Sequence, residues 1–410
     1  MARHVFVVAV MVGVSLFALP ARAQEKTVVQ GNTDFGCRLY RRIAEKPGNV
    51  FCSPFSISTA LAMTAAGARG TTLGQMADVL GLEPLDEAVH GRMGELLADL
   101  NSRALKGRWA QDPNAGQKPF ELVIANALWG QKNYPFSPEF VAIGGKHYGA
   151  GVQALDFKTA LEAARKEING WVEQRTASRI KDLLGPADLT PDVRLVLTNA
   201  IYFKAAWDEP FVARATLDAP FHLAGGEKPA VPTMHRTAGL RTLDVGDADV
   251  VELPYLGDAA SMVLVVPKAL DGLAAIEAKL DRATLDGWLG KLDHQMISLW
   301  LPRFKYTSRF ELSEQLQAMG MVDAFKFPGA DFTAMSPTGE LYIGFVIHQA
   351  YVDVNESGTE AAAATAVGMK AGGAPAQPRE IKADRPFLFL IRDAKTGSIL
   401  FLGRVADPRG

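Results

Sequence analysis

Two short patterns in this sequence could support covalent catalysis by a serine. Ser178 begins an S-x-x-K pattern that ends at Lys181, and residues 395–397 read Lys-Thr-Gly further along the chain. Penicillin-interactive serine enzymes carry these two patterns in this order, with the serine as nucleophile. A pattern with two fixed positions arises about once by chance in a chain this long, and Ser178 is surrounded by charged residues. We therefore keep an acyl-transfer enzyme of this type only as an alternative.

The sequence offers no better catalytic or metal-binding pattern. It contains no GxSxG, HExxH, Walker or C-x-x-C motif, so a structural zinc or iron–sulfur site is excluded. Its two cysteines, Cys37 and Cys52, form one disulfide in an oxidising compartment or stay as two buried thiols. We predict no enzyme activity, no metal and no cofactor.

Composition narrows the class of protein further. The 410 residues are 48% hydrophobic and 21% charged, as in a globular protein with room for one large or two ordinary domains. Lysine and arginine number 43 and aspartate and glutamate 45, which gives a net charge of -2. This balance argues against a nucleic-acid partner.

The N-terminus has the pattern of a secretory signal peptide. Arg3 and His4 precede an apolar run over residues 5–19, and Ala21 and Ala23 form a small-x-small cleavage site. The apolar run is too short to span a membrane. We therefore predict a signal peptide over 1–23, a mature domain over 24–410 and secretion to the exterior or a periplasm, without membrane association.

The remaining chain divides into a helical first third and a strand-rich remainder. Asn32, Thr33 or Asp34 is expected to cap a first helix, and Ser53-Pro54 opens a second. Further helices are predicted over 71–80, 85–105, 138–148 and 159–173, with a strand over 120–129 between them. Later strands are predicted over 193–203, 250–253, 261–266, 296–301, 341–354, 387–391 and 399–405. The prediction is one α+β domain with large, mainly antiparallel sheets.

One long connection, from Asn355 to Asp384, has a pattern of its own. Loops of this length are uncommon in compact domains and are often functional. Read with a period of two, the segment places Glu360 on one face. The residues on the other face are all small or apolar: Thr359, Ala361, Ala363, Thr365, Val367 and Met369. No proline occurs before Pro375, so the segment is able to join a β-ladder. It is therefore suited to be both a loop and a strand.

This segment, with three others, resembles the serpin family. Residues 356–360, Glu-Ser-Gly-Thr-Glu, followed by four alanines and Thr365, resemble the serpin reactive-loop hinge. Residues 49–58, NVFCSPFSIS, and 198–207, TNAIYFKAAW, are similar to the family's second helix and central strand. Residues 384–391 and 399–405 are similar to its C-terminal hairpin. Four separate motifs in the family's order make the resemblance specific.

The resemblance implies a secreted inhibitor that acts as a suicide substrate. A serine protease would cleave the exposed reactive loop, about 356–384, and form an acyl-enzyme. The freed hinge would insert between the strands predicted over 193–203 and 341–354 and trap the enzyme. Arginine at an inward hinge position should then turn the inhibitor into a substrate. The hinge residues are Glu356, Gly358, Thr359, Glu360, Ala361, Ala362, Ala363, Ala364 and Thr365.

The resemblance also assigns two clusters that control opening of the sheet. The breach, at the top of the strands, would contain Trp207, Arg303 and Glu356, with arginine where the family usually has lysine. The shutter, under the sheet centre, would contain Ser53, Ser56, Asn199 and His348. None of these residues performs chemistry.

The cleaved bond is harder to place. The family's usual spacing from the hinge glycine points to Gly372–Gly373, but the loop is a few residues long before Pro386 and the register can slip. Lys370 suits a trypsin-like pocket, and small residues suit elastase-like or subtilisin-like enzymes, which we favour. Papain-like cysteine proteases remain candidate targets. The candidates at the cleavage site are Met369, Lys370, Ala371, Gly372 and Gly373.

The main alternative function is that of a serpin with the same fold but without inhibitory activity, such as a carrier or a chaperone. Such members tend to carry bulky, charged or proline residues in the hinge, whereas the inward face here is small from Thr359 to Thr365. Arg103, Lys106 and Arg108 could bind a heparin-like polyanion or form a solvated face. We expect a monomer whose partner is the target protease.

Overall fold

The computed structural model describes residues 27–102, 120–360 and 378–410. Its strands form two sheets. The nine-stranded sheet runs in the order β1-β15-β14-β8-β7-β6-β9-β13, with β5 paired to β6. Its strands are β1 (Val50–Cys52), β15 (Ile399–Val405), β14 (Phe387–Asp393), β8 (Ala260–Pro267), β7 (Ala248–Pro254), β6 (Ala230–Asp244), β9 (Asp293–Pro302), β13 (Arg379–Lys382) and β5 (Leu217–Pro220).

The six-stranded sheet has the order β10-β11-β12-β4-β2-β3. Its strands are β10 (Phe304–Glu311), β11 (Ile347–Asn355), β12 (Gly358–Thr359), β4 (Leu195–Ala206), β2 (Phe120–Gln131) and β3 (Val152–Leu155). Most strand pairs in both sheets are antiparallel; β11 with β4, β2 with β3 and β13 with β9 are parallel. The predicted α+β class with mainly antiparallel sheets is confirmed.

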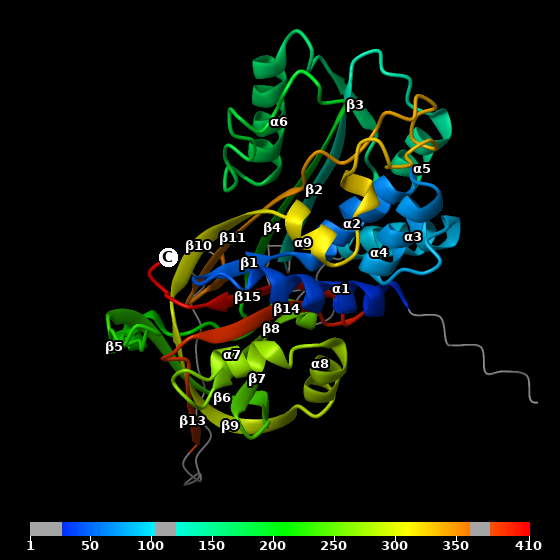
Figure 1. Cartoon of the computed structure of the whole chain (residues 1–410). Helices are drawn as coiled ribbons and strands as arrows, with labels where there is room; N and C mark the ends of the chain where they lie inside the picture. The colour runs from blue at the N-terminus through cyan, green and yellow to red at the C-terminus, as the bar shows by residue number, and fades with distance from the viewer. Residues whose placement is uncertain (1–26, 103–119, 361–377) are drawn as a thin grey trace, which may run out of the picture.

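The helices of the described residues gather mainly around the six-stranded sheet. Figure 1 shows α1 to α5 on one side of it and α6 on the other. The helices are α1 (Val28–Ile43), α2 (Pro54–Ala65), α3 (Gly70–Leu80), α4 (Glu87–Ser102), α5 (Pro138–Tyr148), α6 (Leu161–Arg175), α7 (Leu273–Ala278), α8 (Arg282–Leu289) and α9 (Ser313–Ala318).

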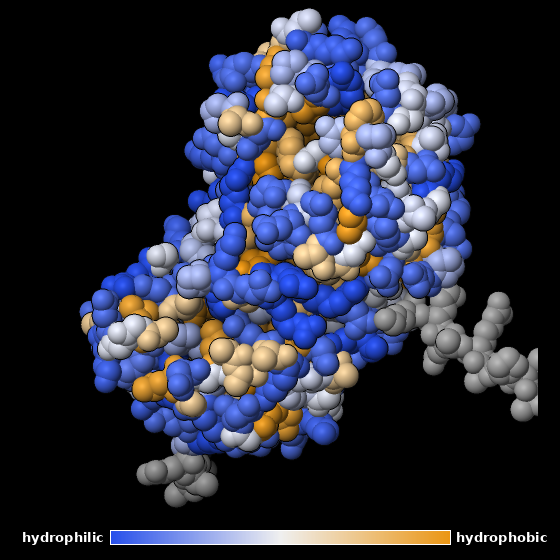
Figure 2. Space-filling model, viewed as in Figure 1, coloured by the Kyte–Doolittle hydropathy of each residue, from blue (hydrophilic) through white to orange (hydrophobic). Residues whose placement is uncertain are grey.

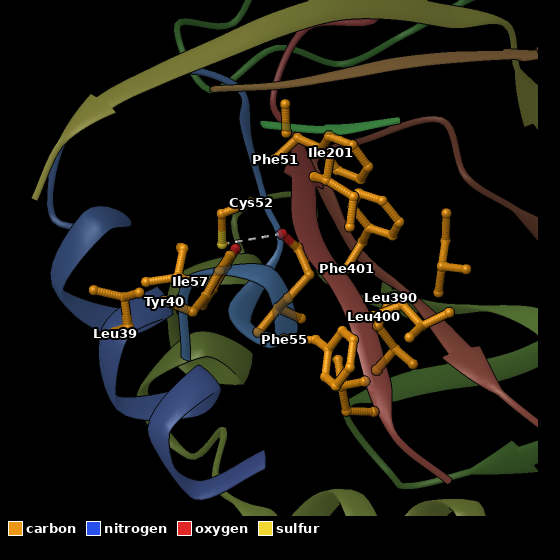
Figure 3. Packing of buried hydrophobic residues seen from close by; sticks show 14 of the residues in the cluster. Leu39, Tyr40, Phe51, Cys52, Phe55, Ile57, Ile201, Leu390, Leu400 and Phe401 are labelled. Atoms are coloured by element: carbon orange, nitrogen blue, oxygen red, sulfur yellow. Dashed lines mark hydrogen bonds between the residues drawn. The ribbon is translucent and has the colours of Figure 1, made fainter. Parts of the chain in front are cut away.

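Helix α2 is the centre of the packing. Ser53 caps it, Pro54 occupies its first turn, and all 12 of its residues are buried, so it has no solvent-exposed face. Aromatic rings of β1 and β15 stack beside it, with Phe51 and Phe401 centroids 4.8 Å apart. Figure 3 shows side chains from α1, α2, β1, β14 and β15 converging there. α6 instead packs Ile168 and Val172 on the opposite face of the sheet.

The two cysteines are separate in the structure. Cys37 and Cys52 are both free and buried. Burial raises the pKa of each thiol to about 12, which keeps both protonated and unreactive at neutral pH. Of the two alternatives, the structure shows the buried thiols.

The largest differences from the predicted boundaries are at the start of the first helix and at the start of the strand predicted over 341–354. α1 begins at Val28, where Thr27 and Gln30 form a capping box. Asn32 therefore lies inside the helix, where its side chain accepts a hydrogen bond from Ser58 Oγ at 2.6 Å. In the strand predicted over 341–354, residues 341–346 join no ladder. The Ile343 amide instead donates to the carbonyl of Ala324, in the short 3-10 helix Asp323–Phe325, at 2.8 Å.

Candidate functional site

The most unusual feature of the six-stranded sheet is the short contact between β4 and β11. These parallel strands pair over only four positions, Ile347–Ala350 opposite Thr198–Ile201. Below them, β4 and residues 341–345 border a pocket of about 380 Å³, lined by Leu195, Leu197 and Phe345 among others. Figure 2 shows hydrophobic residues in a furrow beside α6 in this part of the surface. The two strands are therefore held together mainly at their centre.

Above this contact, β12 already lies between the two strands. Gly358 and Thr359 pair antiparallel with Asn355 and Val354 of β11 and with Ala206 and Ala205 of β4. Gly358 has φ of +148°, and a Cβ there would lie 2.0 Å from the Ala205 carbonyl oxygen. Only glycine fits at this point. Thr359 is 1% exposed, and its hydroxyl lies 2.7 Å from that of Tyr255, so its side chain faces the α2 side of the sheet.

The turn between β11 and β12 is fixed by Glu356. Its carboxylate accepts from Arg303 Nε at 2.8 Å, from the second Arg303 nitrogen and from the Thr216 hydroxyl. Burial alone would raise the pKa of Glu356, but the hydrogen bonds from Arg303 and Thr216 outweigh it and lower the pKa. Arg303 therefore makes the predicted contact with Glu356.

Trp207 holds the same turn from the β4 side. Its ring stacks on Tyr255 with centroids 4.6 Å apart. Its indole Nε1 donates to the Asn355 carbonyl at 3.0 Å, and its amide donates to the Ser357 carbonyl at 2.9 Å. The structure thus brings the three predicted breach residues around one turn.

Glu360 is buried where the described chain leaves the sheet. Its φ is +55°, and its side chain is 2% exposed. Arg179 Nε lies 2.5 Å from its carboxylate, yet neither carboxylate oxygen makes a hydrogen bond of good geometry. Burial is the main reason that its pKa is raised, and Arg179 opposes the rise only in part. Arg179 was not predicted as a partner of Glu360, because in the sequence it is only one of several charged residues around Ser178.

Glu360 and Glu356 should give opposite pH effects on stability. The folded protein binds the Glu360 proton more tightly than the unfolded chain does, so this group's contribution to stability falls as pH rises above the ordinary pKa of 4.5. Glu356 has a lowered pKa, and its contribution is lost as pH falls below that value. We expect Glu360→Gln to raise, and Glu356→Gln to lower, the urea midpoint at pH 7. Equal shifts in both variants would contradict the assignment.

The predicted shutter residues form one hydrogen-bond network. Ser53 Oγ accepts from the Ser56 amide at 3.1 Å and donates to the Leu400 carbonyl at 2.7 Å. The Ser53 amide donates to His348 Nε2 at 3.0 Å, so the His348 proton resides on Nδ1, 2.5 Å from Asn199 Oδ1. Complete burial lowers the pKa of His348 to about 3, and the ring is neutral.

Asn126 extends the network to a third strand. Asn199 Nδ2 donates to Ser56 Oγ at 2.7 Å and to Asn126 Oδ1 at 2.8 Å. Asn126, Asn199 and His348 lie directly opposite one another across β2, β4 and β11. The sequence analysis missed Asn126, although an amide within an apolar strand was an available signal. Separating β4 from β11 must break the bond between His348 and Asn199.

The patterns that suggested a serine enzyme do not form a site. Ser178 is exposed, Lys181 pairs with Glu173 at 3.2 Å, and Lys395 pairs with Asp99 at 2.6 Å. Among the described residues no group of three or more His, Cys, Asp or Glu side chains could hold a metal ion. No helix in the described ranges is long and apolar enough to cross a membrane.

Several predicted residues lie outside the described ranges. These are the signal peptide, the basic residues Arg103, Lys106 and Arg108, the rest of the hinge from Ala361 to Thr365, and all candidates for the cleavage site.

Similarity to known proteins extends along most of the chain. Residues 30–408 match a family model described as Serpin (serine protease inhibitor). The chain is 38% identical to the human leukocyte elastase inhibitor, over 92% of this chain and 98% of the relative. It superposes on Serpin48 of the insect Tenebrio molitor with a TM-score of 0.81 and 30% identity, covering 94% of this chain and 100% of that one.

A second solved structure is the complex of human thyroxine-binding globulin with its hormone. It has a TM-score of 0.82 and 31% identity, and the match covers 93% of this chain and 99% of that chain. The family model and the curated relative each extend over most of the sequence. This chain therefore belongs to the serpin family of serine protease inhibitors.

Proposed function

We propose that this serpin inhibits its target by covalent trapping, with insertion of the cleaved loop between β4 and β11. The position of β12 carries the proposal. Two hinge residues already occupy the gap at its upper end, and they run antiparallel to both neighbours. Continued insertion would replace one short parallel pairing with two antiparallel ones, which are slightly more stable per residue.

The register of β12 defines how far the loop would travel. Thr359 lies opposite Ala205, and the same register brings Met369 opposite Leu195, the first residue of β4. At about 3.3 Å per residue, that segment spans about 33 Å. An acyl-enzyme attached beyond Met369 would therefore be carried along the whole of β4.

Loop insertion would trap the protease by preventing hydrolysis of the ester that joins it to the inhibitor. The catalytic serine attacks the carbonyl of the scissile residue, the new amine leaves, and an ester joins enzyme and inhibitor. Water normally cleaves this ester with help from the oxyanion hole. Loss of one donor there slows such chemistry by about 10² to 10³, so an enzyme distorted by translocation keeps the ester.

The proposed targets are elastase-like or subtilisin-like serine proteases. Ala371, Gly372 and Gly373 are small enough for their narrow specificity pockets. The 38% identity to a leukocyte elastase inhibitor supports this class. Lys370 would suit trypsin-like enzymes, which are a second class of candidate targets. Cysteine proteases are a third class. We also propose that residues 1–23 direct secretion and that the mature protein is a monomer.

A carrier role is the alternative function. The observation in its favour is the similarity to thyroxine-binding globulin, which was solved with thyroxine. A carrier would be cleaved in the loop without retaining the protease, so the same experiment separates the two functions.

Mixing the mature protein with elastase, subtilisin and trypsin should give a covalent complex with at least one enzyme. We expect a band that survives heat and detergent, and a released C-terminal peptide whose mass identifies the scissile bond between Met369 and Ala374. The intact protein should have the mass of a chain beginning at Gln24. A protease inactivated at its serine is the control and should give no such band. Cleavage by all three enzymes without a complex would reject covalent trapping of these classes.

A further inference from the structure

The chain between β4 and β5, residues 207–216, braces the turn between β11 and β12, and we call it the bracing segment. Three of its donor groups bind residues of that turn. They are the Trp207 amide, which donates to the Ser357 carbonyl at 2.9 Å, the Phe211 amide, which donates to the Glu356 carbonyl at 2.9 Å, and the Thr216 hydroxyl, which donates to the Glu356 carboxylate. The position of the hinge therefore depends on what holds the bracing segment itself.

Arg236, on β6 of the nine-stranded sheet, contacts the bracing segment through its side chain. Its guanidinium donates a hydrogen bond to the Glu209 carbonyl. The same group lies over the buried Phe211 ring, with Cζ 5.0 Å from the ring centroid. Both contacts go to the bracing segment, so Arg236 joins that segment to a different sheet from the one that the hinge enters.

The surroundings of Arg236 favour these contacts over contacts with water. Burial lowers the pKa of Arg236, and the carboxylates of Asp208 and Glu209, both in the bracing segment, oppose this change. An arginine nevertheless keeps its charge in a protein. Cation–π contacts and hydrogen bonds are stronger where water is excluded. Loss of this guanidinium should therefore loosen the bracing segment.

One backbone contact of the bracing segment does not involve Arg236. The Asp208 amide donates to the Pro254 carbonyl at 3.0 Å, next to the point where Trp207 bridges Tyr255. These contacts hold the start of the segment, whereas Arg236 holds the part around Phe211. A variant at Arg236 should therefore change the local position of Phe211 without unfolding the sheet.

We propose that Arg236 is a positioning residue for the hinge. It acts through Phe211: the guanidinium holds the ring, the Phe211 amide stays against the Glu356 carbonyl, and β12 stays between β4 and β11. Loop insertion can then start from a strand that is already in register. This last consequence rests on the proposed function, whereas the position of the hinge does not.

Hydrogen exchange of the mature protein, followed by mass spectrometry, tests the positioning role without a protease. The reporter is the exchange of the amides of residues 358–360, where the Glu360 amide donates to the Asp353 carbonyl at 2.8 Å. Arg236→Gln should speed this exchange by about 10-fold, as loss of a hydrogen bond from a charged group does. Exchange at residues 347–350, in the centre of β11, should stay at the wild-type rate.

Two further variants separate hinge positioning from a general loss of stability. Arg241→Gln is the matched control, because Arg241 also lies on β6 but pairs with Glu252. It should leave exchange at 358–360 within about twofold of the wild-type rate. Phe211→Leu removes the ring under Arg236 and should speed that exchange as Arg236→Gln does, which keeps the test available if Arg236→Gln does not fold. Wild-type exchange in Arg236→Gln, or equal acceleration in Arg241→Gln, would overturn the proposal.

The number of inhibitor molecules needed per protease tests the consequence for trapping. Arg236→Gln should raise this number by about twofold or more, because insertion would start from a hinge that spends more time outside the sheet. Arg241→Gln should not change it. Faster exchange with an unchanged number would overturn the effect on trapping. Absence of any covalent complex with the wild-type protein would reject the proposed function, and the exchange result would still decide the positioning role.

Discussion

Replacing Ala361 with glutamate should convert this serpin from an inhibitor into a substrate, whereas glutamate at Ala362 should leave inhibition nearly intact. The structure fixes the phase of the alternation: Thr359 faces the α2 side of the sheet, and Glu360 faces Arg179. On insertion, the register of β12 places Ala361 opposite Phe203 and Ala362 opposite Tyr202.

These two neighbours differ sharply. Phe203 is 1% exposed and packs against Tyr255 and Phe401, with centroids 5.3 and 5.8 Å away, so a carboxylate beside it would be buried without a partner. An unpaired buried charge costs about 3–5 kcal/mol, which slows insertion by about 100-fold or more. Tyr202, in contrast, lies on the face of Glu360 and Arg179. The Arg179 side chain is 48% exposed, so a carboxylate added on this face lies outside the Phe203 core and near a partly solvated cation. Arginine at Ala361 should act like glutamate, but arginine at Ala362 would meet Arg179 and is a poorer control.

The measurement is the number of inhibitor molecules needed to inactivate one protease molecule. Ala361→Glu should raise this ratio by about 100-fold, with rapid cleavage and little covalent complex on denaturing gels. Ala362→Glu should change it by less than about threefold. Both variants should unfold at the wild-type urea concentration. Undiminished inhibition by Ala361→Glu would contradict the insertion mechanism.

His348→Ala should destabilise the native protein by about 2–6 kcal/mol and let β4 and β11 part without cleavage. The substitution leaves the Ser53 amide without its acceptor and Asn199 Oδ1 without the His348 donor. Each buried unsatisfied group costs about 1–3 kcal/mol. His348 and Asn199 are opposite residues in the four-pair contact of β4 with β11. The lost hydrogen bond therefore weakens the same strand contact that insertion must break.

His90→Ala is the control, because His90 is also buried but its ring contacts Tyr148, at 2.6 Å, outside the shutter network. Both variants should lower the urea midpoint. Only His348→Ala should lose inhibitory activity on incubation at 37 °C without protease and yield an intact, more stable product. The same rate of loss in both variants would exclude a specific role for His348.

The wild-type pH profile follows from the same residue. Because burial lowers the pKa of His348 to about 3, from an ordinary 6.5, the unfolded chain binds the proton more tightly between these values. Stability should therefore fall as pH decreases from 6.5 towards 3. His90, whose pKa burial lowers to about 4, should contribute a similar slope from pH 6.5 down to about 4.5, and Glu356 adds to it below that value. His348→Ala should therefore remove about half of the slope between pH 6.5 and about 4.5.

Local patterns in the sequence determined much of the architecture. Ser53 followed by Pro54 predicted the start of α2, the helix predicted over 71–80 is α3, and residues 138–148 were predicted as the helix found there. These signals involve residues close in the chain, so they can be read without knowledge of the fold. Strands β6 and β10 were missed because charged or hydroxyl residues interrupt their apolar alternation.

Only the tertiary structure decided which groups meet at the gap between β4 and β11. The alternation of residues 359–369 predicted a strand, but not that Gly358 and Thr359 already lie between two others. The contacts of Glu360 with Arg179, and of Asn199 with His348, join residues distant in the chain. Such contacts depend on the register in which separate strands pair, and a shift of one residue would turn each side chain to the other face. The sequence therefore determined a segment able to become a strand, and the sheet determined where that strand can enter.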